Sequence, residues 1–364
     1  MNSLNDRLLE ISKLEKYELY PPFPKKNLLI EVTNKCNSNC IFCANSKMKR
    51  KRKYIDPALL EKILKEAFEL GMIEVGFYTT GESLLDNNLS KYIKLAKNIG
   101  YKYIYITTNA ILLNNRKIKE LVDAGIDSIK LSINAINKKD YEFIHGVNYF
   151  DTVISNLKSL YNYRKNEKLQ FKIYVSYIAT RYTDYSVAKI KAFFADYCDE
   201  VAVVNVRNQS GLMPEINKYL SCEKQKNKIK AERILPCHYV FNTVNVSCEG
   251  YLTACCTDFE NYLVYADLNK ETLKDSWHNE VITELRRQHL NKKLEENLCN
   301  NCIYSSESLP IPLNESLCTA MTKEVFDSKK TLNRIEKYTN LWLSKFLQVF
   351  FVKFLRKLWF SLKL

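Results

Sequence analysis

The feature that most constrains the fold is a repeated alternation of short β-rich runs with amphipathic helical stretches between residues 28 and 206. Predicted strands cover 28–33, 73–78, 101–108, 128–134, 169–179 and 200–206. Predicted helices cover 57–70, 87–99, 115–124, 137–143, 150–164 and 184–197. Consecutive strand–helix units require parallel strands joined by right-handed crossovers, in either a doubly wound sheet or a partial barrel. In both arrangements ligands bind at the carboxyl ends of the strands.

Length, composition and charge narrow the class of protein. A chain of 364 residues suggests two or three domains. With 46% hydrophobic and 26% charged residues, it has a globular composition that excludes a disordered chain or a membrane bundle. The net charge of +14 favours anionic partners without selecting one kind. The charged amino-terminal segment has no apolar signal-like core, so we expect a cytoplasmic protein whose cysteines stay reduced.

Three cysteines follow the first predicted strand with the spacing C-x3-C-x2-C, at Cys36, Cys40 and Cys43. Three thiolates on one loop suit a [4Fe–4S] cluster in which one iron has no protein ligand. Zinc is the alternative, but a structural zinc site needs a fourth ligand, and no further Cys or His stands nearby in the sequence. The spacing therefore favours the iron–sulfur cluster.

With this motif, residues 25–206 resemble the radical SAM superfamily, whose preference for an aromatic residue before the third cysteine is matched by Phe42. The resemblance implies a partial (βα)6 TIM-like barrel, with Phe42 beside the cofactor site. It also implies that the open iron binds S-adenosylmethionine. Cleavage of that cofactor would give a 5′-deoxyadenosyl radical, which takes hydrogen from the substrate.

A second part of the resemblance follows the second predicted strand. The run from Thr79 to Ser83 is similar to the GGEP motif of the family, with departures at Thr80 and Ser83. The two central positions, Gly81 and Glu82, are retained. The resemblance implies that Gly81 allows close backbone approach and that Glu82 accepts the amino group of S-adenosylmethionine.

Polar residues also end the next predicted strands. Asn109 closes a Thr-Thr-Asn run similar to the TTN of the family, and Ser132 and Asn134 end the fourth strand. The resemblance implies cofactor contacts for all three, with the last two near the ribose or carboxylate. The alternative for Ser132 and Asn134 is capping of the following helix. Arg181, after the fifth strand, is a candidate clamp for a carboxylate or a substrate anion.

A second group of cysteines lies downstream and resembles the SPASM domain of many radical SAM enzymes. The matching positions are Cys237, Gly250, Cys255, Cys299 and Cys302. The longer seven-cysteine pattern would continue at Ser308 and Pro312, which offer no thiolate. The resemblance therefore implies the shorter twitch arrangement, with four cysteine ligands and one auxiliary [4Fe–4S] cluster that carries electrons. Two alternatives stay open: zinc in place of the cluster, and Cys256 in place of Cys255.

Two basic segments remain. Residues 47–53 hold six bases in seven positions, which indicates either a solvated charge run or a site for a polyanionic substrate such as a phosphorylated sugar. We expect no specific nucleic-acid binding, because the run lacks interleaved aromatic residues. Residues 341–364 form a basic amphipathic pattern with regularly spaced charges, which predicts a helix at the inner membrane face, against a partner protein or folded back on this chain.

The expected organisation is an extension (1–27), a radical SAM core (28–206), a linker (207–236), an auxiliary-cluster domain (237–318) and a tail (319–364). We expect a radical SAM oxidoreductase that oxidises a sugar or aminocyclitol alcohol, supplied with electrons by a reductant such as flavodoxin or ferredoxin. The auxiliary cluster would accept the electron left on the substrate. The alternatives are modification of a ribosomal peptide and a non-enzymatic zinc-stabilised binding module. No catalytic acid or base is assigned.

Overall fold

The six predicted strands are all present in the computed structural model, and they form a parallel sheet. They are β1 (Leu28–Ile30), β2 (Glu74–Gly76), β3 (Tyr103–Thr108), β4 (Ser128–Ser132), β5 (Lys172–Ala179) and β6 (Glu200–Asn205). Each pairs with the next in chain order, β6-β5-β4-β3-β2-β1. Because this order never reverses, it is that of a partial barrel and excludes the doubly wound alternative.

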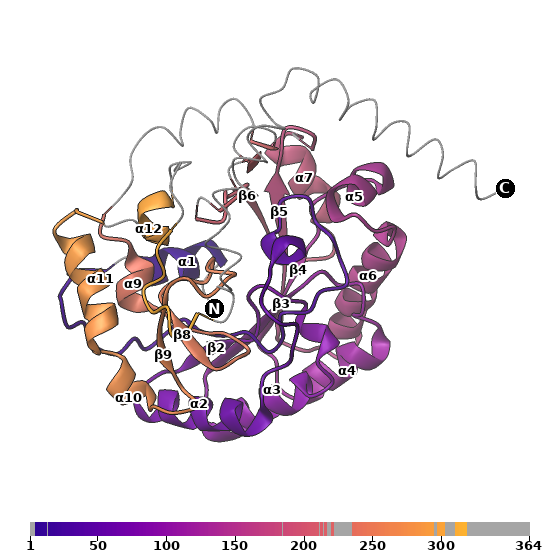
Figure 1. The fold of residues 1–364 in the computed structure, drawn as a ribbon. Helices are drawn as coiled ribbons and strands as arrows, with labels where there is room; N and C mark the ends of the chain where they lie inside the picture. The colour runs from indigo at the N-terminus through magenta and orange to yellow at the C-terminus, as the bar shows by residue number, and fades with distance from the viewer. Residues whose placement is uncertain are drawn as a thin grey trace, which may run out of the picture. The chain divides into compact units, whose positions relative to one another are not determined.

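Helices follow these strands as the alternation predicts. They are α2 (Pro57–Glu69), α3 (Leu89–Ile99), α4 (Asn115–Asp123), α5 (Lys138–His145), α6 (Phe150–Asn166) and α7 (Val187–Phe194). Figure 1 shows α3, α4 and α6 along the outer side of the strands. The start of α2 is defined by Asp56, whose side chain accepts a hydrogen bond from the Leu59 amide, and by Pro57 in the first turn. Its apolar side is buried, with Ile63 and Leu64 fully covered.

The carboxy-terminal segment continues the same sheet, which the sequence pattern does not predict. It contains α9 (His238–Asn242), β7 (Val244–Val246), β8 (Tyr251–Thr253), β9 (Val264–Asp267), α10 (Leu273–Ser276), α11 (Glu280–Leu290) and α12 (Leu298–Asn301). Strand β7 pairs parallel with β1, and β8 and β9 follow antiparallel. The result is one sheet of nine strands with β6 and β9 at its edges.

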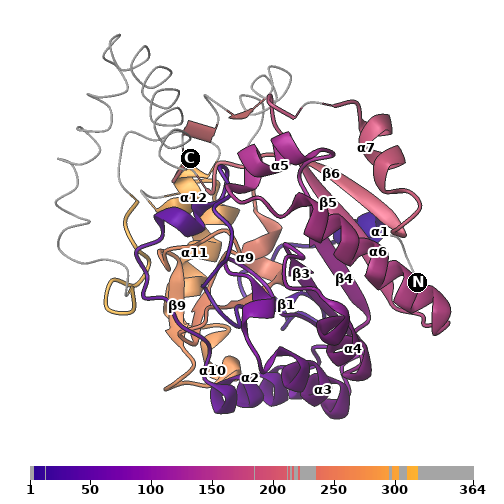
Figure 2. The same cartoon turned by 90° about the vertical axis from the view of Figure 1, so that its right-hand side faces the viewer.

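An additional helix, α1 (Leu4–Ser12), packs at the amino-terminal ends of the strands. The Leu4 amide donates a hydrogen bond to Glu200 at the start of β6. Arg7 forms an ion pair of 2.6 Å with Glu74 at the start of β2, and its guanidinium lies 4.2 Å from the ring centre of Tyr105. Helix α1 thus covers the end of the barrel opposite to the predicted ligand site (Figure 2).

The structure describes residues 4–12, 14–183, 185–210, 212–213, 215–216, 220–221, 235–294, 297–302 and 310–318. The predicted tail helix at 341–364, Ser308 and most of the predicted linker lie outside these residues. In the part of the chain that is described, no helix combines the length and apolarity needed to cross a bilayer.

Candidate active site

The loop after β1 carries the first three cysteines and is held by the end of α5. Backbone hydrogen bonds join the Asn39 amide to the His145 carbonyl at 2.9 Å and the Ile41 amide to the Ile144 carbonyl at 3.0 Å. Burial, together with the nearby Glu82 and Cys43, raises the pKa of Cys36 to about 11. Burial, with Cys43 and Cys36 close by, also raises the pKa of Cys40. The three thiols therefore share one partly buried place.

The placement of these thiols can be compared with the spacing that a single zinc ion requires. Zn–S bonds of 2.3 Å in a tetrahedral site place sulfurs about 3.8 Å apart. Among the described residues, no three potential ligands drawn from Cys36, Cys40, Cys43 and His145 come within 4.8 Å of one another. The described thiols are therefore not gathered at the spacing of a single zinc site.

The loop after β2 places Gly81 and Glu82 against the cysteine loop. A Cβ at Gly81 would lie 2.1 Å from the Thr33 carbonyl oxygen, so only glycine permits this approach. The Glu82 carboxylate is 3% exposed and accepts hydrogen bonds from the Leu84 amide, the Thr108 hydroxyl and the Asn109 amide at 2.7–3.0 Å. Burial raises the pKa of Glu82, and these three hydrogen bonds oppose the rise. The site therefore holds a desolvated carboxylate with a fixed orientation.

Asn109 connects the end of β3 to the cysteine loop. Its side-chain amide donates to Asn37 Oδ1 at 2.7 Å and to Ser38 Oγ at 3.1 Å, and lies 4.0 Å from the Cys36 sulfur. Its backbone amide is the one that binds Glu82. Two motifs that the sequence presents separately thus form one hydrogen-bonded unit around the three thiols.

The downstream cysteines come from segments far apart in the chain that meet near α11. Cys255 and Cys256 lie in the turn after β8, where a hydrogen bond from the Cys256 thiol lowers the pKa of Cys255. Cys237 and Cys256 are close enough to interact electrostatically. The Cys237 amide contacts His289 at 3.4 Å, and Asn297, which caps the helix carrying Cys299, donates to Gln288 at 3.1 Å. Adjacent residues of α11 therefore hold both segments.

Sequence comparison identifies the family. The pattern of the radical SAM superfamily matches residues 30–178, and that of the SPASM iron–sulfur cluster-binding domain matches residues 237–303. The chain is a radical SAM enzyme with a SPASM domain. Its cofactors are accordingly [4Fe–4S] clusters and S-adenosylmethionine, and the alternative of a zinc-stabilised binding module is set aside.

Three similar proteins illustrate the range of this radical SAM family. The probable GTP 3′,8-cyclase of Methanothermobacter thermautotrophicus is 32% identical over 136 residues, which span 37% of this chain and only 44% of that relative. The solved structure of BtrN in complex with AdoMet and 2-DOIA aligns at 19% identity with a TM-score of 0.51, covering 79% of this chain and 96% of BtrN. SuiB of Streptococcus suis, bound to its precursor peptide SuiA, aligns at 16% identity with a TM-score of 0.59, covering 86% and 78%. At such identities the two structures establish the fold alone.

The radical SAM core also contains His145, a residue whose place at the site the sequence does not reveal. Its Nδ1 lies 3.3 Å from the Cys40 sulfur, and its Nε2 lies 3.3 Å from the Asn134 side-chain amide. Stacking on Tyr141 fixes the ring, and burial lowers the pKa of His145 to about 4, so it is neutral. The sequence offers His145-Gly146 only as a candidate lining of the barrel mouth, and the contact with the cysteine loop could not be predicted from a lone histidine with no spaced partner.

The other cofactor candidates occupy distinct surroundings. Ser132 lies at the carboxyl end of β4, 3.3 Å from the Ser176 hydroxyl of β5. Asn134 accepts a hydrogen bond from the Ile178 amide at 2.8 Å. Neither caps α5, whose N-cap is Asn137, so the capping alternative was wrong. Phe42 is 7% exposed and belongs to an apolar cluster of side chains behind the cysteine loop.

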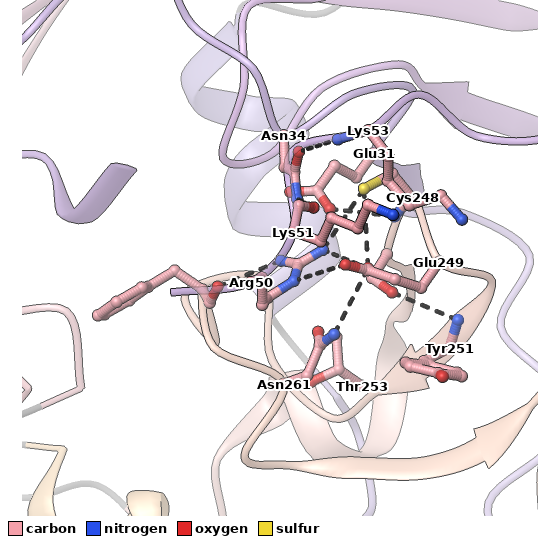
Figure 3. A network of polar contacts seen from close by, with 12 residues as sticks. Glu31, Asn34, Arg50, Lys51, Lys53, Cys248, Glu249, Tyr251, Thr253 and Asn261 are labelled. Carbon is pink, nitrogen blue, oxygen red and sulfur yellow. Dashed lines mark hydrogen bonds and ion pairs between the residues drawn. The ribbon is translucent and has the colours of Figure 1, made fainter. Parts of the chain in front are cut away.

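The basic run at 47–53 is buried at one of its two arginines. Arg50 is 3% exposed and forms ion pairs of 2.5 Å with Glu31 and with Glu249 (Figure 3). Arg52 is exposed, and it donates to the Asn34 carbonyl at 2.6 Å and to the Asn45 side chain at 3.0 Å. Lys47, Lys49 and Lys51 are exposed as well, as a solvated run predicts. Arg50 differs from both predicted roles, because it joins the cysteine loop to the SPASM domain.

A small cavity is lined by residues of both the radical SAM core and the SPASM domain. Its lining includes Thr79 and Thr80 of the loop after β2, and Cys255 and Cys256 of the turn after β8. The ion pair of Glu31 and Arg50 also lines it. The cofactor loop and the auxiliary cysteines thus face a common space.

Proposed function

We propose that this enzyme oxidises a small-molecule alcohol of the sugar or aminocyclitol class to a ketone. The observation that carries the proposal is that Thr79 and Thr80, of the loop after β2, line the same small cavity as Cys255 and Cys256 of the SPASM domain. When bound, the cofactors would supply a 5′-deoxyadenosyl radical and an electron acceptor. An alcohol substrate would give its C–H hydrogen atom to the radical, one electron to the acceptor and its O–H proton to solvent, which leaves the ketone.

The radical SAM core supplies the first set of residues. Cys36, Cys40 and Cys43 would hold the cluster with the open iron. Glu82 would accept the amino group of S-adenosylmethionine, because its carboxylate is desolvated and oriented by Thr108 and by the Asn109 amide. Asn109 also orders the cysteine loop through its side chain. Phe42, Ser132 and Asn134 stay candidates for the remaining cofactor contacts.

The SPASM domain supplies the second set. Four thiolates would hold the auxiliary cluster: Cys237, Cys255, Cys299 and Cys302. Four protein ligands leave no open iron, which suits electron transfer better than direct substrate binding. Arg207, after β6, lies beside the thiols of Cys255 and Cys256 and the Tyr239 hydroxyl, and would offset the negative charge of the site. A reductant such as flavodoxin or ferredoxin would deliver the electrons that begin the cycle.

The second candidate is modification of a ribosomal peptide. It is supported by the likeness of the whole described fold to SuiB, which was solved with its precursor peptide. The two candidates differ in the size of the substrate and in whether the reaction ends as a two-electron oxidation.

The deciding experiment compares substrate classes directly. The reconstituted enzyme is incubated anaerobically with S-adenosylmethionine and dithionite, together with panels of sugars, aminocyclitols, sugar phosphates or synthetic peptides. We expect one small molecule to stimulate formation of 5′-deoxyadenosine and to lose two hydrogens, as measured by mass spectrometry. Stimulation by peptides alone, or a product that keeps its hydrogens, would reject alcohol oxidation. The Cys198→Ala variant is a matched cysteine control, since Cys198 donates to the Phe194 carbonyl on the outer helix α7.

A further inference from the structure

Lys130, in the middle of β4, is a cation of the radical SAM core that takes part in neither cysteine site. It pairs in register with Thr107 of β3 and with Tyr174 of β5. Its neighbours along the strand, Ile129 and Leu131, are fully buried, whereas Lys130 is partly exposed. Successive strand residues face opposite sides of a sheet. Lys130 therefore points away from the helix-covered face and into the barrel.

The surroundings of Lys130 include residues from both regions of the molecule. Its ammonium lies 5.3 Å from the ring centre of Tyr78, which directly precedes the cofactor loop at Thr79. It also interacts electrostatically with Cys256 of the SPASM domain and with Arg7 of α1. The lysine thus has neighbours in the radical SAM core, in the SPASM domain and in α1.

The charge of Lys130 has no carboxylate partner in the described part of the chain. Glu74, the acid at the base of the barrel, is paired with Arg7. Burial and the charge of Arg7 together lower the pKa of Lys130 to about 8, against an opposing effect of Cys256. The group stays largely protonated at neutral pH, at a cost in desolvation that an incoming anion would offset.

A second polar group beside Lys130 also lacks a partner. Thr107 is its register neighbour on β3, and the Thr107 hydroxyl is buried without a hydrogen bond. Buried hydroxyls are almost always hydrogen-bonded, so an unsatisfied one indicates a missing partner. A cation and a donor hydroxyl on adjacent inward positions form the elements of an oxyanion site.

We propose that Lys130 and Thr107 form a subsite that binds an oxyanion of the substrate, either a carboxylate or a phosphate group. The subsite rests on the proposed function, because it assumes that the substrate occupies the barrel interior. In this proposal the cation that recognises the substrate lies on the barrel wall, because Arg50 and Arg52 of the basic run bind groups of the protein itself. Lys130 would be a specificity residue that orients the substrate between the two cysteine sites.

The test measures the reactivity of Lys130 without any turnover. The reconstituted holoenzyme is labelled with a trace of acetic anhydride, and the acetylation of each lysine is quantified by peptide mass spectrometry. Labelling is repeated with inorganic phosphate, with acetate and with glycerol as a neutral probe. We expect one anion to reduce acetylation of Lys130 about tenfold, as a charge-assisted hydrogen bond would. Lys94, exposed on α3, serves as the internal reference and should not change.

Labelling in phosphate and in acetate identifies which anionic group the subsite binds, and the remaining outcomes reject the subsite. Protection by phosphate points to a phosphorylated substrate, and protection by acetate points to a carboxylate. Labelling of Lys130 that neither anion changes, or that glycerol reduces equally, would overturn the proposal. The Thr107→Val variant should lose most of the protection while the other lysines keep their labelling pattern, which verifies its fold. Full protection in that variant would also count against the site.

The same experiment separates this inference from the proposed function. Anion protection at Lys130 with no alcohol oxidation by the holoenzyme would retain the subsite and reject the reaction. Oxidation of an alcohol with no protection at Lys130 would retain the reaction and reject the subsite.

Discussion

The two cysteine sites of this enzyme are built in opposite ways. In the radical SAM core, three thiols lie within the eight residues from Cys36 to Cys43, on one loop. In the SPASM domain, the thiols come from the start of α9, the turn after β8 and the short helix α12. The first site is thus defined by local spacing, whereas the second exists only when a nine-stranded sheet and α11 bring distant segments together. Loss of a ligand should therefore have different consequences at the two sites.

The largest expected effect is at the local site. Changing Cys36, Cys40 and Cys43 together to alanine should abolish cleavage of S-adenosylmethionine, because no thiolate remains to hold its cluster. Iron content should fall from about eight to about four atoms per chain, since each cluster contains four irons. Iron analysis and chromatography of 5′-deoxyadenosine measure both quantities. Full cleavage activity in the triple variant would show that the first site lies elsewhere.

Loss of ligands at the auxiliary site in the SPASM domain should affect the oxidised product but not the formation of 5′-deoxyadenosine. In the Cys299→Ala/Cys302→Ala variant, we expect 5′-deoxyadenosine to form while the oxidised product is lost, since radical formation depends on the other site. About four irons should remain. If 5′-deoxyadenosine and the soluble fold disappeared together, the auxiliary cysteines would be structural and the electron-transfer role would fail. The Cys198→Ala variant controls for the loss of a thiol as such.

The contact between the radical SAM core and the SPASM domain offers a third test. Arg50 is buried between Glu31 of the core and Glu249 of the SPASM domain, so Arg50→Met leaves two buried carboxylates without their cation. Removing one partner of a buried ion pair costs about 3–5 kcal/mol, and we expect that loss in the free energy of unfolding from urea titration. Neutralising Glu31 as well, in Arg50→Met/Glu31→Gln, should restore part of it. Additive losses in the double variant would contradict the ion-pair interpretation.

A smaller effect is expected at the cofactor carboxylate. Glu82→Ala should weaken binding of S-adenosylmethionine by about 1–3 kcal/mol, through loss of a charge-assisted hydrogen bond in a closed site. Iron content should stay unchanged. Glu61→Ala, on the outer face of α2, is the matched control, because Glu61 pairs only with Lys65 on the same helix. Unaltered affinity in an equilibrium titration would leave Glu82 as a turn residue.

The smallest expected effect is on stability, at a second contact between the radical SAM core and the SPASM domain. In this contact Glu260 accepts a hydrogen bond from the Lys49 amide at 2.7 Å. Burial raises the pKa of Glu260 to about 7, so the folded state holds a proton that the unfolded state releases above its ordinary pKa of 4.5. Stability from this group is therefore present at low pH and is lost as pH rises from about 4.5 to 7. Glu260→Gln should raise the free energy of unfolding by about 1–2 kcal/mol at pH 7 and leave it unchanged at pH 4. An equal gain at both values would contradict the pKa shift.

The elements that sequence patterns predicted are those set by local chemistry. Each strand and helix between 28 and 206 follows from its own hydrophobic period and caps, and the cysteine spacing of the core is confined to one loop. Glu82 could be singled out because it stands next to a glycine at a strand end. Its orientation by Thr108 could not, since that contact joins separate strands.

The residues that the patterns missed act over long range. His145 reaches Cys40 only after α5 docks on the loop, and Arg50 meets Glu249 only after β7 pairs with β1. A run of bases in a sequence contains no information about which of them will be buried. Lys130 did have a signal, because it stands between two apolar residues of a predicted strand and must face the opposite side from them.

The pairing of β7 with β1 has a mechanical consequence. Backbone hydrogen bonds across one continuous sheet are far stiffer than a surface contact between two lobes, and they break only when the sheet itself opens. The strands that carry the two cysteine loops therefore belong to one hydrogen-bonded framework. We expect the core and the SPASM domain to move as one body, so that any motion that admits a substrate comes from loops rather than from hinging between the two regions.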